Sequence, residues 1–132
     1  MIPGLVEITL VAGGGAAGGA ARYWVTGYVD GRVGTPFPWG TLTVNASGAF
    51  LLGLLAGAWS TPTALLQAPA GTLLAIGLLG SYTTVSAFSL QTMALARRGD
   101  TRGALINTIA NVLGGLLLVA LGYGAARLAT GA

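Results

Sequence analysis

The sequence predicts an all-α integral membrane protein with four transmembrane helices, the third of them broken. Two observations carry this prediction. Of the 132 residues, 54% are hydrophobic and only 7% are charged, and positions 33–96 contain no charged residue. Soluble domains carry about 25% charged residues, whereas a helix needs about 20 apolar residues to cross a bilayer. Four such helices nearly use up the chain, so we expect a single domain over residues 1–132.

The ionisable side chains exclude several function classes. The chain has no Cys, His or Lys, and its net charge of +3 comes from six arginines against Glu7, Asp30 and Asp100. Disulfides, thiolate chemistry and histidine–metal sites are therefore excluded. We do not expect an enzyme, because acid–base catalysis uses His or a paired carboxylate and the three acids lie at span ends or in connectors. The arginines flank apolar runs, so we expect them beside lipid headgroups rather than nucleic acid.

Four apolar runs define the expected membrane spans. They cover residues 5–28, 39–59, 70–96 and 103–128. The connectors contain Pro, Gly or charged residues, which are typical helix stops; they are residues 29–38, 60–69 and 97–102. Aromatic rings prefer the membrane interface, and several stand near the span ends: Trp24, Tyr28, Trp39, Trp59 and Tyr123. Glu7, in place of Lys or Arg, argues against a cleaved signal peptide.

Small and polar residues recur every fourth position in the first, second and fourth spans. This spacing places them on one helix face, where small residues let two backbones approach closely. Asn45, Asn107 and Asn111 are the amide members of these stripes. A single asparagine in a span often only joins two helices, but three of them on small-residue faces also indicate a polar path.

Arg22 is the only charged residue well inside an apolar run. Its side chain could reach back to the membrane interface. It could also attract an anion or bond to backbone carbonyls, since charges within the membrane are usually functional or paired. The sequence leaves these roles open.

The third span contains an unusual polar cluster. Six of the ten residues at positions 80–89 carry a hydroxyl group: Ser81, Tyr82, Thr83, Thr84, Ser86 and Ser89. Hydroxyl groups at membrane depth are unfavourable unless they are paired or line a polar cavity. β-Branched and small polar residues at positions 83–86 weaken a helix. We therefore expect a break, which would free carbonyls for a cation and amides for an anion. The alternative is an intact helix whose hydroxyls bond to carbonyls four residues back.

Three motifs follow one another along the chain: GGAARY at 18–23, GTLTVNASGAFLLG at 40–53 and GLLGSYTTVSAFS at 77–89. They resemble motifs of the Fluc/CrcB family of bacterial fluoride channels, and the resemblance extends over nearly the whole chain. It implies a fluoride-specific channel subunit in the bacterial inner membrane. Such a subunit lets fluoride leave the cell passively and so relieves fluoride toxicity.

The resemblance also implies an antiparallel, inverted dimer with two fluoride pores along the subunit interface. A structural Na⁺ ion between the subunits would be held by the backbone carbonyls of Gly80 and Thr83. The implied fluoride pathway consists of Asn45, Thr84, Val85, Ser86 and Phe88. Amides, hydroxyls and the edges of aromatic rings suit this task, because they replace water around the anion without a full charge that would hold it too tightly.

The chain departs from the family pattern at four positions. Val85 replaces the first of two phenylalanines, and Gln91 stands where the family often has glutamate. Asn107 and Asn111 stand where it tends to have Tyr and Ser. Valine has no ring quadrupole to offer an anion, whereas the two asparagines add donors to the expected pathway.

The arginine distribution predicts a fixed orientation. If both termini lie on one side, the opposite connectors carry four arginines and the terminal side carries Arg127 alone; the four are Arg32, Arg97, Arg98 and Arg102. The positive-inside rule then places these connectors in the cytoplasm. Together with Val85, this bias favours an oppositely oriented paralogous partner over a dimer of identical chains.

Two alternative functions remain. In the first, the chain is a non-conducting or half-functional structural subunit of a heterodimeric fluoride channel. The second is a small proton-coupled multidrug exporter. Proton coupling calls for a carboxylate at mid-membrane, and Glu7 lies too close to the start of the first span to provide one.

Overall fold

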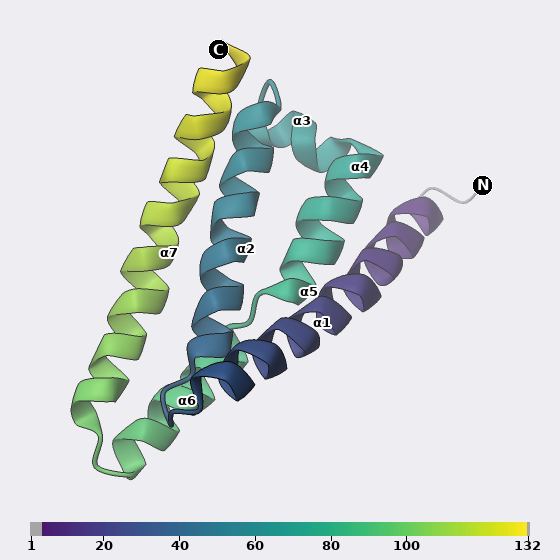
Figure 1. Ribbon diagram of the computed structural model, residues 1–132. Helices are drawn as coiled ribbons and strands as arrows, with labels where there is room; N and C mark the ends of the chain where they lie inside the picture. The colour runs from purple at the N-terminus through teal and green to yellow at the C-terminus, as the bar shows by residue number, and fades with distance from the viewer. Residues whose placement is uncertain (1–3, 132) are drawn as a thin grey trace.

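The computed structural model describes residues 4–131, and every regular element in that range is helical (Figure 1). The predicted all-helical class is confirmed for these residues. The elements are α1 (Leu5–Val33), α2 (Trp39–Ala58), α3 (Pro62–Gln67), α4 (Pro69–Gly71), the π-helix η1 (Thr72–Leu79), α5 (Gly80–Tyr82), α6 (Val85–Arg97) and α7 (Thr101–Thr130). The segments α4, η1, α5 and α6 follow one another as a single interrupted arm.

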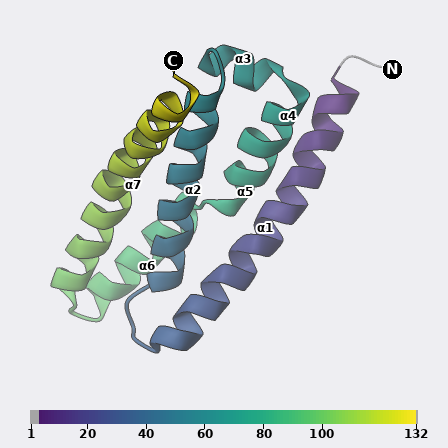
Figure 2. The same ribbon diagram turned by 45° about the horizontal axis from the view of Figure 1, so that its top comes forward.

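The long elements lie side by side in the order α7, α2, interrupted arm and α1 (Figure 2). The α1–α2 and α6–α7 connectors lie at one end of the molecule, and the outer ends of α1 and α7 lie towards the other (Figure 1). Arms that follow one another along the chain therefore run in opposite directions, whereas the packed pairs α2–α7 and α1–η1 run in the same direction. The outer ends of α1 and α7 thus lie on the same side of the molecule, as the predicted orientation assumes.

Among the described residues, three helical stretches are long and apolar enough to cross a membrane: Trp39–Ala58, Pro69–Arg97 and Thr101–Thr130. The 29-residue α1 is not one of them. Its glycines contribute little hydropathy, and Arg22 lowers the mean further. The predicted class of helical membrane protein is thus confirmed, with three apolar helices long enough to span a membrane. A fourth span at α1 stays a prediction.

Two local features differ from the sequence expectation. Helix α1 continues to Val33, past the predicted span end at residue 28, and ends at Gly34, whose φ of 64° is a left-handed conformation that favours glycine. The connector 60–69 contains the short helix α3. The hydroxyl oxygen of Thr61 accepts a hydrogen bond from the Ala64 amide (3.1 Å), and Pro62 follows it as the first helical residue. A Thr-Pro pair is a sequence signal for such a helix start.

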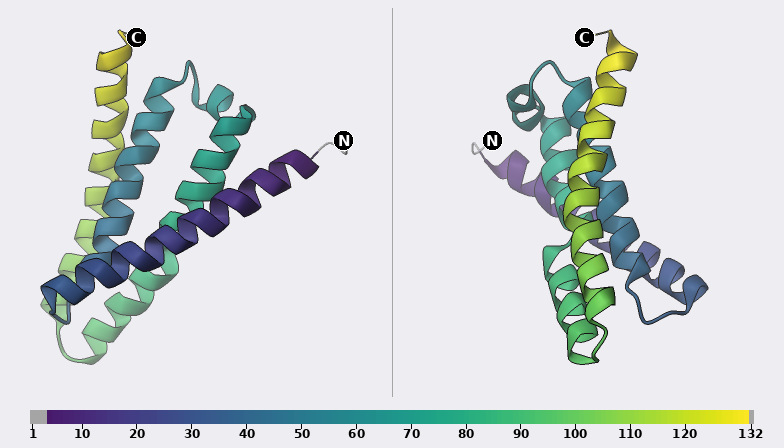
Figure 3. Two further views of the ribbon diagram at one scale, coloured as in Figure 1. Left: turned by 45° about the vertical axis from the view of Figure 1, so that its right-hand side comes forward. Right: turned by 90° about the vertical axis from the view of Figure 1, so that its left-hand side faces the viewer.

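Glycines spaced four residues apart form the contact faces of two helix pairs, α2 with α7 and α1 with η1, as their spacing predicted. In α2, an added Cβ at Gly53 or Gly57 would meet the backbone of α7. In α1, an added Cβ at Gly14 or Gly18 would meet the backbone of η1, which α1 crosses obliquely (Figure 3). Small residues thus let the backbones touch, which is the usual way to gain packing energy between helices in lipid.

The sequence of η1 carries no pattern that predicts a π-helix. Its residues are apolar, and it leads directly through α5 into the segment where the third arm is interrupted. π-Helical turns are rare and occur frequently at functional sites. The interruption of the third arm is therefore the place where a functional site is expected.

The contact between α1 and η1 gives a direct test of the packing. Gly18→Ala should destabilise the folded protein by about 1–3 kcal/mol, because its new methyl group overlaps the Leu78 carbonyl. Gly19→Ala, one residue away with open space around it, is the matched control. Thermal unfolding in detergent measures both. Equal midpoints for the two variants would show that α1 does not rest on η1 in this way.

Candidate functional site

The third arm is broken at Thr83 and Thr84. Their backbones are extended, with ψ values of 160° and 125°, between the end of α5 and the start of α6. Thr84 then acts as the N-cap of α6, because its hydroxyl oxygen accepts a hydrogen bond from the Ala87 amide (3.2 Å). The predicted break is confirmed, and the alternative of an intact helix is wrong.

Asn45 of α2 holds the break open. Its Nδ2 donates to the Thr84 carbonyl (2.9 Å), and its Oδ1 accepts from the Thr84 amide (2.8 Å). In a continuous α-helix the Thr84 amide would donate to the carbonyl of Gly80, four residues earlier. Asn45 takes this amide instead and so frees the Gly80 carbonyl oxygen.

Arg22 of α1 contacts the same segment. Its Nη1 donates to the Thr83 carbonyl (3.3 Å), and the side chain is half-buried. Of the three roles that the sequence left open, bonding to a backbone carbonyl is the one observed. The guanidinium group of Arg22 therefore lies at the Thr83 carbonyl, which is one of the two expected sodium ligands.

The three asparagines, which lie far apart in the sequence, meet beside the break. Asn45 Nδ2 also donates to Asn111 Oδ1 (2.8 Å), and Asn111 Nδ2 donates to the carbonyl and Oδ1 of Asn107 (2.9 and 3.0 Å). Asn107, which is only 1% exposed, donates to the hydroxyl of Thr92 on α6 (2.9 Å). These bonds connect α2, α6 and α7.

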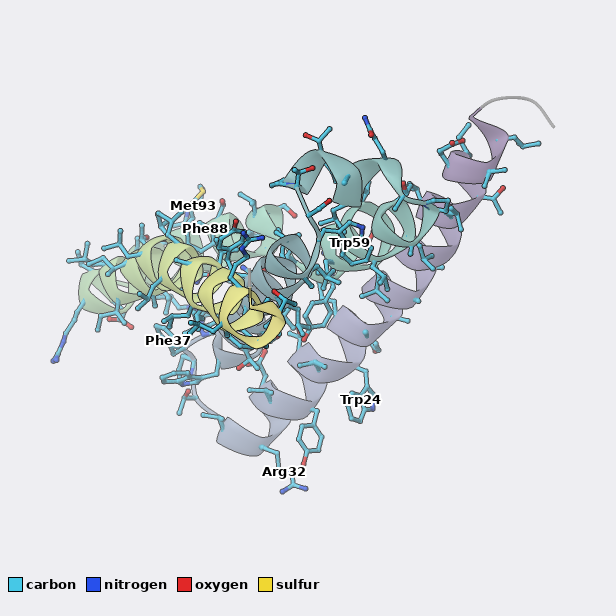
Figure 4. The ribbon with its side chains drawn as sticks, turned by 90° about the horizontal axis from the view of Figure 1, so that it is seen from above. Trp24, Arg32, Phe37, Trp59, Phe88 and Met93 are labelled. Carbon is cyan, nitrogen blue, oxygen red and sulfur yellow. The ribbon has the colours of Figure 1, made fainter. Side chains whose placement is uncertain are left out.

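A pocket of about 420 Å³ lies between the break, α2 and α7. The pocket brings together seven of the predicted site residues: Asn45, Gly80, Thr83, Thr84, Val85, Phe88 and Asn111. The rest of its lining comes from apolar residues and glycines, and no charged side chain contributes to it. Phe88 is half-buried on α6 (Figure 4), whereas Val85 is 76% exposed.

Three predicted site residues lie outside this lining. Ser86 is exposed, and its hydroxyl lies 3.2 Å from that of Thr84. Asn107 accepts a hydrogen bond from Asn111 but does not itself line the pocket. Arg22 lines a second pocket on the α1 side of the break.

The second pocket has a volume of about 680 Å³. Its lining includes Arg22, Thr41, Thr84 and Gln91, so Thr84 lies between the two pockets. The Gln91 Oε1 atom is buried without a hydrogen-bond partner among the described residues. Trp24 also contributes to this pocket and projects outward from α1 (Figure 4).

Two polar residues near the break were not among the predicted site residues, although Tyr82 belongs to the predicted hydroxyl cluster. Thr41 is 2% exposed, and the hydroxyl of Tyr82 lies 3.0 Å from that of Ser47 on α2. Thr41 stands four residues before Asn45, on the same face of α2, and this spacing could have revealed it. The partner of Tyr82 depends on how α5 packs against α2, for which the sequence carries no signal.

The fold and the site together define a multi-pass helical membrane protein with a discontinuous helix, beside which a few polar groups line a mostly apolar pocket. Discontinuous helices are a feature of many proteins that move ions. The family model described as "CrcB-like protein, Camphor Resistance (CrcB)" matches residues 9–123. The chain belongs to this CrcB family, which confirms the resemblance found in its motifs.

Full-length relatives support the same assignment. The chain is 45% identical over 128 residues to "Fluoride-specific ion channel FluC 2" of Rhodopseudomonas palustris, which covers 96% of this chain and 95% of the relative. It is 42% identical over 125 residues to "Fluoride-specific ion channel FluC" of Thermus thermophilus, covering 91% and 93%. It is 46% identical over 116 residues to "Fluoride-specific ion channel FluC 3" of Brucella suis, covering 87% of each. These relatives and the apolar helices identify a bacterial membrane protein.

Proposed function

We propose that this chain is a subunit of a fluoride-specific ion channel, through which fluoride leaves the cell passively across the inner membrane. The observation that carries the proposal is its similarity, over nearly the full length, to relatives that bear this name. The pocket at the break adds physical support. It offers polar groups in an otherwise apolar lining without a charged side chain.

The chemistry of the pocket suits a small, strongly hydrated anion. A pore must replace the water around such an ion with donors, yet hold it weakly enough for it to leave. The Thr84 hydroxyl and the positive edge of the Phe88 ring meet both conditions, whereas the Thr83 hydroxyl already donates to the Leu79 carbonyl (3.1 Å). We infer that the pathway passes Thr84, which lines both pockets, and Phe88, which lines the first pocket.

We propose that the working unit is an antiparallel dimer, and that the favoured partner is an oppositely oriented paralogous chain. The two connectors that carry four of the six arginines lie at the same end of the molecule (Figure 1), which supports one fixed orientation. Val85 is 76% exposed beside the break and has no aromatic ring to contribute. A paralogue with phenylalanine there would supply it.

We propose that the same dimer holds a structural Na⁺ ion at the carbonyls of Gly80 and Thr83. Oxygen ligands suit such a hard cation. The Gly80 carbonyl has lost its helical amide partner to Asn45, and the Thr83 carbonyl already accepts from the cationic side chain of Arg22. Two carbonyls do not complete a coordination shell, so the partner's equivalent groups are needed. Bound sodium would add positive charge beside the break.

The first test concerns the aromatic ring in the pocket. In proteoliposomes that conduct fluoride, Phe88→Ile should lower the efflux rate about tenfold, because it removes the ring edge that faces the ion. Phe50→Ile, a matched control on α2 outside the pocket lining, should keep the normal rate. A fluoride electrode follows the efflux. Normal efflux in Phe88→Ile would remove this ring from the pathway.

The second test concerns the partner. The chain is purified alone and reconstituted at a density of about one dimer per vesicle, and fluoride efflux is measured. An obligate paralogous partner predicts almost no efflux from the lone chain, with recovery when a paralogue of opposite arginine bias is co-expressed. Robust efflux from the lone chain would restore the dimer of identical subunits.

The third test concerns sodium. If carbonyls of Gly80 and Thr83 hold Na⁺ between subunits, replacing sodium with N-methyl-D-glucamine should shift the dimer towards monomers in detergent, because the ion then no longer offsets the dipoles of the facing carbonyls. Single-molecule photobleaching or analytical ultracentrifugation measures this shift. An identical dimer fraction in both cations would exclude the proposed ligation.

A further inference from the structure

A continuous hydrogen-bond chain runs from the break to Phe88 through four side chains. We call Asn45, Asn111, Asn107 and Thr92 the asparagine ladder. At one end Asn45 pairs with both backbone groups of Thr84. At the other end the hydroxyl of Thr92 donates to the Phe88 carbonyl (2.8 Å). The ladder therefore contacts both ends of residues 84–88, which carry Val85 and Phe88 into the pocket.

The ladder uses nearly all of its amide donors internally. An asparagine side chain has two N–H hydrogens. Those of Asn45 go to Thr84 and Asn111, and those of Asn111 both go to Asn107. Asn107 gives one hydrogen to Thr92, is almost fully buried and does not line the pocket. An anion could be bound by Asn45 or Asn111 only if one of these bonds were broken.

Surroundings with few other polar groups strengthen the ladder. Asn107 and Thr84 are buried, and the adjoining pocket wall is mostly apolar. A buried amide network whose donors and acceptors are all paired is rigid, whereas a partly paired one is unfavourable. The ladder also differs from ordinary interhelical asparagine contacts, because its two ends bind backbone groups of one non-helical turn and the helix that follows it.

We propose that the asparagine ladder is a brace that positions residues 84–88, and that its asparagines are not ligands of the transported ion. The ladder fixes the direction of the Phe88 ring and keeps the Thr84 amide away from the Gly80 carbonyl. Contacts with the ion fall to the groups that the ladder positions. The effect on ion flux rests on the proposed fluoride conduction, but the effect on backbone order does not.

Hydrogen–deuterium exchange of the whole chain in detergent, without fluoride, tests the brace. Asn111→Leu, which is close in size, removes both the acceptor for Asn45 and the donors to Asn107. Exchange of the amides at 84–88 should become about tenfold faster, while amides in the middle of α1 keep their rates. Fluoride efflux should fall in parallel.

Thr108→Val is the matched control. Thr108 directly follows the ladder residue Asn107 on α7, and its hydroxyl donates only to the Ala104 carbonyl of its own helix (2.9 Å). Its removal breaks no bond between helices. Exchange at 84–88 and fluoride efflux should both stay at the wild-type level.

A second pair of variants serves if Asn111→Leu does not fold. Thr92→Val is isosteric and removes the hydroxyl that accepts from Asn107 and donates to Phe88, so it should speed exchange at 84–88. Thr92→Ser keeps the hydroxyl and should restore slow exchange and efflux. Rescue by serine supports a positioning hydroxyl rather than simple side-chain packing.

The outcomes separate the brace from the proposed function. Unchanged exchange at 84–88 in Asn111→Leu or Thr92→Val overturns the brace. If exchange is unchanged and the fluoride concentration that half-saturates efflux also shifts, the asparagines are ligands of the ion instead. If the wild-type dimer conducts no fluoride, the proposed function fails, and the exchange data still decide the role of the ladder.

Discussion

Pairing of the Asn45 side chain with both backbone groups of Thr84 is the interaction on which this structure depends. In lipid, a backbone amide and carbonyl that leave a helix find no water to bond, so an unassisted break would be strongly unfavourable. Asn45 supplies a donor and an acceptor at 2.9 and 2.8 Å and thereby makes the break tolerable. Everything that characterises the site follows from it: the freed Gly80 carbonyl, the capping of α6 by Thr84 and the pocket beside them.

That interaction requires α2 to lie close to the third arm and α1 to hold the arm from the other side. Glycines on both helices permit the approach, because backbone can contact backbone where no Cβ intervenes. Arg22 reaches the Thr83 carbonyl only because Gly14 and Gly18 bring α1 onto η1. The glycine stripes are therefore part of the site, although none of those on α1 lines the pocket at the break.

Membership of the CrcB family and the particular residues of this chain carry different information. The family relation supports fluoride conduction, whereas Val85, Asn107 and Asn111 concern how this chain builds its pocket. The two α7 asparagines could be expected to add donors to an ion pathway. In the folded chain they bond to Asn45, to each other and to Thr92, so their donors serve the protein. A donor counted in the sequence is available to an ion only if the fold leaves it unpaired.

The sequence by itself determined the helical membrane class, the family and the place of the break, since these follow from local composition, helix propensity and contiguous motifs. It also indicated the close-packed faces, because four-residue glycine spacing is a local property of a helix. Only the tertiary structure decided which partners the polar groups choose. Asn45 and Thr84 are 39 positions apart, and Asn45 and Asn111 are 66 apart. Such pairings, like the π-helix η1 and the Arg22 contact, depend on the relative placement of helices that no local pattern encodes.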